Sequence, residues 1–124
     1  MSRELLEKLY LFRFEWGRPV VISPHSGGIG RQDESQSQHN ALAWGEVRAV
    51  DVFPVVGSGY IRSPVDRYRA YDLARRAGFT GIGLYTDTKP GNMVHLDVRE
   101  DRPPGSPALW SRVQREYLPI GEVF

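Results

Sequence analysis

Apolar positions near the start of the chain repeat every three or four residues, which is the spacing of a helix with one buried face. This segment is residues 2–16, and its stripe consists of Leu5, Leu6, Leu9, Phe12 and Trp16. A Ser stands where it can cap the first turn, and a Gly follows the last residue of the stripe. A second helix is expected over residues 64–77, because Pro occupies its first position and Gly follows its last.

Four short segments, the first of them rich in β-branched residues, predict strands. They are residues 19–23, 49–56, 81–86 and 93–100. Pro54 interrupts the second segment. Because proline cannot donate a hydrogen bond to a neighbouring strand, this strand is expected to lie near the edge of the sheet or to end there.

The end of the chain has a Pro-rich linker followed by large apolar residues at helical spacing. Trp110, Val113 and Tyr117 predict a short helix here, with Trp110 and Tyr117 in the core. The 124 residues suffice for one compact domain, residues 1–124, and are too few for two. The expected fold is α+β, with a small, mainly antiparallel sheet and helices packed on one side of it.

Composition and charge exclude several classes of function. The net charge of +1 gives no basic face for nucleic acid. The chain has no cysteine, which excludes disulfides, Cys-ligated zinc and a thiol nucleophile. The first helix mixes charges among its apolar positions, unlike a signal peptide, and no run approaches the roughly 18 apolar residues of a membrane helix. We therefore expect a soluble protein made in the cytoplasm, without a membrane partner; the sequence indicates no oligomeric state.

Asp51, His95 and Asp97 stand inside the predicted strands, each among apolar neighbours. The period of two in a strand places His95 and Asp97 on one face and their apolar neighbours on the other. Asp51 also lies within an apolar segment, and a buried acid needs a partner or a metal. A further candidate, His39, follows a long polar loop over residues 24–38. Loops of this length are often functional.

His39, Asp51 and His95 come from three separate segments and form a ligand set for a zinc ion with one position open for water. Such a zinc polarises a carbonyl group and lowers the pKa of its bound water towards ~7. The spacing alone leaves a second interpretation open, in which the His and the Asp of the two strands form a polar pair without a metal.

The residues around these ligands carry a family resemblance. They are Ser37-x-His39, the run Arg48-Ala49-Val50-Asp51-Val52, and the run Val94-His95-Leu96-Asp97-Val98-Arg99. These segments resemble the D-Ala-D-Ala carboxypeptidase group of zinc peptidases, which also includes phage endolysins, the vancomycin-resistance dipeptidase and the hedgehog signalling domain. The resemblance spans roughly residues 20–100. It implies a tetrahedral zinc on His39, Asp51 and His95, held by a small sheet flanked by helices.

The resemblance also implies roles for residues near the first ligand. Arg31 would bind a carboxylate or carbonyl group of the substrate, and Ser37 would support the site from behind the metal ligands. From their positions alone, Trp44 is a candidate to line the substrate groove and Tyr85 to donate a hydrogen bond to a tetrahedral intermediate, with aromatic packing as the alternative for both. His25 is a candidate to steady an oxyanion, with a solvated turn residue as its alternative.

Two departures from the family pattern affect the ligand set and the catalytic base. The first His and the Asp are usually seven residues apart, whereas His39 and Asp51 are twelve apart (51 − 39 = 12), so Glu46, at the seven-residue spacing, is a rival ligand. We prefer Asp51 because its surrounding run fits the motif. Family enzymes also carry an acid three residues before the last His, where this chain has Asn92. An amide cannot accept the proton of the zinc water.

Three other acids can replace the missing general base. Asp97 is the first choice, because it shares the face of His95; Asp87 is the second and Glu46 the third. For Asp97 the alternative is a structural role, in which it orients a ligand His or pairs with Arg99. With one of them in this role, the sequence predicts a zinc-dependent carboxypeptidase or endopeptidase that cuts peptidoglycan stem peptides. The alternative is a non-catalytic module that keeps the fold and the metal. Either would fit a phage particle or a protein released by host lysis.

Overall fold

The computed structural model describes residues 2–23, 47–103 and 105–124. The elements in chain order are α1 (Arg3–Trp16), β1 (Val20–Ile22), β2 (Ala49–Val56), β3 (Gly59–Tyr60), α3 (Pro64–Ala77), β4 (Gly81–Tyr85), β5 (Met93–Asp97), β6 (Ala108–Val113), β7 (Glu116–Leu118) and the 3-10 helix η1 (Ile120–Val123). The helices predicted over residues 2–16 and 64–77 and all four predicted strands are present, with ends that differ by at most three residues.

Side chains and glycines at the helix ends explain where the helices begin and stop. The hydroxyl of Ser2 accepts a hydrogen bond from the backbone N–H of Leu5, and Ser63 caps α3 in the same way. Both caps satisfy a backbone N–H that has no partner within the helix. Gly17 and Gly78 end the helices with φ of 77° and 96°, a left-handed conformation that glycine adopts without strain.

The strands form one mixed sheet that is mostly antiparallel, as the sequence predicts. Its order is β1-β2-β5-β4-β6-β7, and β3 forms a short hairpin with β2. The only parallel pair among the described strands is β4 and β6. Pro54 lies opposite Val20 in the three-residue edge strand β1, so β2 is indeed next to the edge of the sheet.

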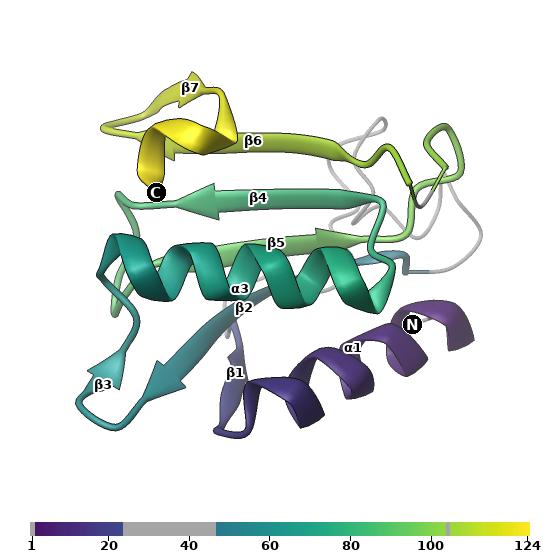
Figure 1. Cartoon of the computed structure of the whole chain (residues 1–124), viewed down its shortest axis with the longest axis horizontal. Helices are drawn as coiled ribbons and strands as arrows, with labels where there is room; N and C mark the ends of the chain where they lie inside the picture. The colour runs from purple at the N-terminus through teal and green to yellow at the C-terminus, as the bar shows by residue number, and fades with distance from the viewer. Residues whose placement is uncertain (1, 24–46, 104) are drawn as a thin grey trace.

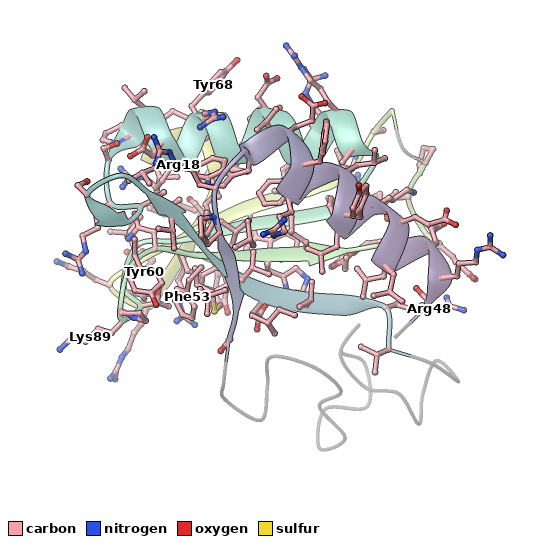
Figure 2. All side chains as sticks on the ribbon, turned by 90° about the horizontal axis from the view of Figure 1, so that it is seen from below. Arg18, Arg48, Phe53, Tyr60, Tyr68 and Lys89 are labelled. Carbon is pink, nitrogen blue, oxygen red and sulfur yellow. The ribbon has the colours of Figure 1, made fainter. Side chains whose placement is uncertain are left out.

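Both helices cover the same face of this sheet (Figure 1), which confirms the expected one-sided packing. The core lies between the two layers, and every second residue of the central strands points into it. Figure 2 shows the opposite arrangement for Phe53, which points away from the helices. The fully buried apolar side chains include Leu5, Phe12, Trp16, Val50, Val52, Phe79, Ile82, Leu84, Val94 and Leu96.

The predicted C-terminal helix is wrong, because residues 108–118 form the hairpin of β6 and β7. Gln114 and Arg115 make its two-residue turn with φ of 49° and 69°. Such turns favour Asn or Gly, so this one lacks the usual sequence signal. The expected core role of Tyr117 is also wrong, since 62% of it is exposed, whereas Trp110 is half-buried on the sheet face opposite the helices.

Two phenylalanines of α1 test this packing. Phe12 is fully buried and contacts Trp16 and Phe79, whereas 67% of Phe14 is exposed. We expect Phe12→Ala to lower the free energy of unfolding by about 3–5 kcal/mol, because it leaves a cavity in the core. Phe14→Ala is the matched control and should change it by less than about 1 kcal/mol. Equal shifts of the urea midpoint would contradict the packing of α1.

Candidate functional site

Four residues line up across the middle of the sheet. Asp51 on β2 lies directly opposite His95 on β5, and His95 lies opposite Gly83 on β4. Gly83 in turn lies opposite Trp110 on β6. Directly opposite residues point to the same side of a sheet. Because the alternate residues of these strands fill the core under the helices, this row occupies the other face.

His95 lies between two carboxylates, one on each side of its ring. Its Nδ1 is 3.0 Å from Oδ1 of Asp51, and its Nε2 is 2.7 Å from Oδ2 of Asp97. All three side chains are buried. The predicted common face of His95 and Asp97 is therefore present, and the strand register adds Asp51 to it.

Arg99 holds the carboxylate of Asp97 in place. Its Nε donates to Oδ1 at 2.9 Å, its Nη2 donates to Oδ2 at 2.6 Å, and its backbone N–H donates to Oδ1 at 3.2 Å. A paired guanidinium and carboxylate of this geometry fix each other in orientation as well as by charge. Asp97 has no exposed surface, so Arg99 and His95 take the place of water around its charge.

Two glycines of β4 provide the space for this arrangement. A Cβ atom on Gly81 would lie 2.1 Å from Oδ1 of Asp97, and one on Gly83 would lie 2.4 Å from Nε1 of Trp110. Any other residue would therefore displace the Asp97 carboxylate or the Trp110 ring. Alternating glycines inside a strand signal such a close approach. The sequence analysis did not use this signal, and it missed Gly81, Gly83 and Trp110 as parts of the site, whereas the pairing of Asp97 with Arg99 was one of the two roles it considered for Asp97.

Aromatic side chains border the row on the β6 side. The ring of Trp110 lies 5.1 Å from that of His95, and the Arg99 guanidinium lies 5.2 Å from the Trp110 ring. Trp110 donates its indole N–H to the hydroxyl of Tyr85 at 2.9 Å. Burial raises the pKa of Tyr85 to about 12, so this hydroxyl stays neutral. The structure thus places Tyr85, a predicted substrate-binding residue, beside the site.

The charges of the site are set by mutual hydrogen bonds. Burial alone would lower the pKa of His95, but hydrogen bonds to Asp51 and Asp97 and the charges of both acids raise it to about 9. For Asp97, burial alone would raise the pKa, because it disfavours the charged carboxylate. Hydrogen bonds from His95 and Arg99 instead hold the pKa of Asp97 well below its usual range. Without a metal, His95 is therefore a cation and donates both ring N–H groups.

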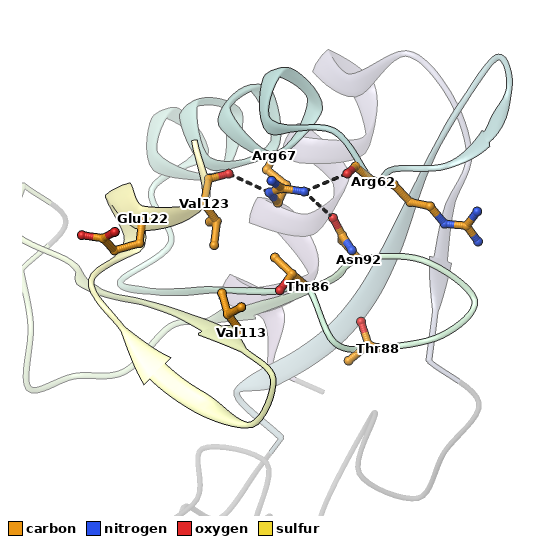
Figure 3. A pocket seen from close by; sticks show the side chains of 8 residues that line it. All are labelled: Arg62, Arg67, Thr86, Thr88, Asn92, Val113, Glu122 and Val123. Carbon is orange, nitrogen blue, oxygen red and sulfur yellow. Dashed lines mark hydrogen bonds between the residues drawn. The ribbon is translucent and has the colours of Figure 1, made fainter.

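Asn92, which stands where the family has its acid, and Asp87, the second choice for the general base, bond to other parts of the fold. Oδ1 of Asn92 accepts a hydrogen bond at 2.9 Å from Arg67 on α3, beside a polar pocket of about 440 Å³ (Figure 3). The carboxylate of Asp87 accepts from Nε of Arg112 at 3.0 Å and from the backbone of Arg115 at 2.7 Å.

The remaining predicted site residues lie outside the described residues. These are His25, Arg31, Ser37, His39, Trp44 and Glu46. Within the described part of the chain, no group of three or more His, Cys, Asp or Glu side chains is arranged to hold a metal ion. A metal bound to Asp51 and His95 would need at least one further ligand, and the predicted one, His39, lies outside the described residues.

Comparisons of the chain with protein-family models, with curated proteins and with solved structures gave no match. No helix in residues 2–23, 47–103 or 105–124 is long and apolar enough to cross a membrane.

The raised pKa of His95 predicts a pH dependence of the metal-free protein. Its folded value of about 9 exceeds the unfolded value of about 6.5, so protonated His95 stabilises the fold. This contribution should be fully present below about pH 6.5 and be lost as the pH rises through about 9. Urea unfolding of chelator-treated wild type and His95→Gln should give free energies that converge over this range. A difference that stays constant from pH 6 to pH 10 would contradict the charged His95.

Proposed function

We propose that this chain is a zinc-dependent peptidase that hydrolyses peptidoglycan stem peptides and that its metal is held by His39, Asp51 and His95. The observation that supports the proposal best is the direct opposition of Asp51 and His95 across two strands, with Oδ1 and Nδ1 3.0 Å apart. We also propose that the mostly antiparallel sheet with its two helices has the fold of the D-Ala-D-Ala carboxypeptidase and hedgehog group, which the sequence motifs resemble.

The 3.0 Å between these two atoms is an ordinary hydrogen-bond distance, and a shared zinc ion would lengthen it only slightly. Ligand atoms about 2.0–2.1 Å from a tetrahedral zinc lie about 3.3 Å from each other, close to the observed 3.0 Å. A metal would replace the proton on Nδ1, while Nε2 keeps its proton and its hydrogen bond to Asp97. When bound, zinc would supply a Lewis acid that polarises the scissile carbonyl and activates water.

The chain's own residues would bind and orient the peptide around that centre. Arg31 would pair with a carboxylate or carbonyl group of the substrate, and Ser37 would support the ligand His39. Trp44 and Tyr85 would line the groove, and the hydrogen bond from Trp110 fixes the position of the Tyr85 hydroxyl.

A non-catalytic module with the same metal site is the second candidate. It is favoured by the contacts of the acids and of Asn92. The Asn92 side chain bonds to α3, and the carboxylates of Asp87 and Asp97 each pair with an arginine. A protein that only binds metal or cell-wall peptide needs no proton acceptor at these positions.

Metal content is the first test of the site. Purified wild-type protein should contain about one zinc per chain by elemental analysis, and the double variant His39→Ala, His95→Ala should contain none, because two of three ligands are removed. Asp72→Ala is the control, since Asp72 pairs with Arg75 and Arg76 on α3 and should not affect the metal. Wild-type protein without metal, even after zinc is added back, would rule out the peptidase.

Digestion of purified peptidoglycan separates the two candidates. The zinc-loaded protein should release new amino or carboxyl ends from stem peptides, detected by mass spectrometry of the soluble fragments. Chelator-treated protein and the double variant are the controls and should release none. Full zinc content without any cleavage would favour the non-catalytic module.

A further inference from the structure

We infer that Asp97, locked by Arg99, is a positioning residue that presents Nδ1 of His95 to the metal, and that it is not the proton acceptor of the reaction. This inference deepens the proposed function and rests on it. It assigns the tautomer of His95. It also explains how Arg99, Gly81 and Trp110 contribute to the site, since they hold Asp97 and the His95 ring in position.

The carboxylate of Asp97 has no acceptor site left for a hydrogen bond from a further donor. A carboxylate offers about four acceptor sites, two on each oxygen. Oδ2 accepts from His95 and from Nη2 of Arg99, and Oδ1 accepts from Nε and the backbone N–H of Arg99. All four sites are therefore occupied by residues of β5 and the segment that follows it. With its side chain also fully buried, Asp97 cannot reach a water molecule or a leaving amine.

The same contacts indicate which ring nitrogen of His95 would face a metal that is shared with Asp51. Nε2 is directed at the carboxylate of Asp97, at 2.7 Å, and Nδ1 at that of Asp51, at 3.0 Å. Asp51 is a proposed metal ligand, so Nδ1 would face the metal. Asp97 lies on the other side of the ring, and its acceptor sites are all occupied by hydrogen bonds. A metal ligand His commonly donates its second N–H to a carboxylate, which fixes the tautomer and the orientation of the ring.

The surrounding residues prevent this carboxylate from moving. Gly81 provides the space in which it lies, since a Cβ atom there would be 2.1 Å from Oδ1. Trp110 packs against both His95 and Arg99, at 5.1 and 5.2 Å. Trp110 is in turn held by its hydrogen bond to Tyr85. The position of the His95 ring thus depends on a connected set of side chains from β4, β5 and β6.

Zinc affinity measured by competition with a chromogenic chelator tests the inference. Asp97→Ala should weaken zinc binding by about 10- to 100-fold, because the ring loses the partner of Nε2. Asp97→Asn should keep most of the affinity, since its amide oxygen still accepts from Nε2. Arg99→Gln should have a smaller effect than Asp97→Ala and serves if that variant does not fold. Asp72→Ala is the control and should bind zinc as the wild type does.

Long-range ¹H–¹⁵N NMR of the zinc-loaded protein gives a second readout that a purely structural role would not affect. His95 should show a proton on Nε2 and none on Nδ1 in the wild type and in Asp97→Asn. The inference is overturned if Asp97→Ala binds zinc as tightly as the wild type, if Nδ1 carries the proton, or if Asp97→Asn loses hydrolysis with zinc affinity unchanged. Absence of zinc in the wild type would instead refute the proposed function, and this inference with it.

Discussion

The buried hydrogen-bonded series of Asp51, His95, Asp97 and Arg99 constrains the rest of the sheet. Two carboxylates, an imidazolium and a guanidinium sum to no net charge in the metal-free protein. Ions are costly to bury, and their attraction offsets this cost only where the geometry satisfies every donor and acceptor. The register of β2, β5 and β4 meets this condition, because it places Asp51 and Gly83 on either side of His95. A shift by one residue would turn Asp51 into the core and Val52 out of it.

The sheet can carry ionisable residues on one face because both helices pack against the other face. Both helices bury their apolar stripes against the same side of the sheet, so the core needs only alternate residues of the central strands. The other alternate residues are then released from packing the helix-covered core and can be polar. In β4, two of them are glycines, and the absence of side chains there lets Asp97 and Trp110 lie across the strand. The site thus depends as much on missing side chains as on ionisable ones.

The elements that follow simple periodicity could be predicted from the sequence, and those that depend on distant partners could not. The alternation around Asp51 and His95 correctly places both on the face opposite the core. The spacing of Trp110 and Tyr117 fits a helix equally well, and only the pairing of β6 with β4 decides for a strand. The sequence leaves two roles open for Asp97, proton acceptor or partner of Arg99, and only the side-chain geometry shows that Arg99 occupies its carboxylate.

The saturation of Asp97 also bears on where a general base would have to come from. Asn92 bonds to α3, Asp87 pairs with Arg112, and every acceptor site of Asp97 is occupied. Of the acids considered from the sequence, this leaves Glu46. It stands seven residues after His39, so as the base it would lie close in sequence to a proposed ligand. In that case the two departures from the family pattern are connected: the acid missing before His95 is replaced by one within the longer interval between His39 and Asp51. With Glu46 in this role the chain would have the chemistry that the resemblance implies, and without it only the proposed metal site would remain.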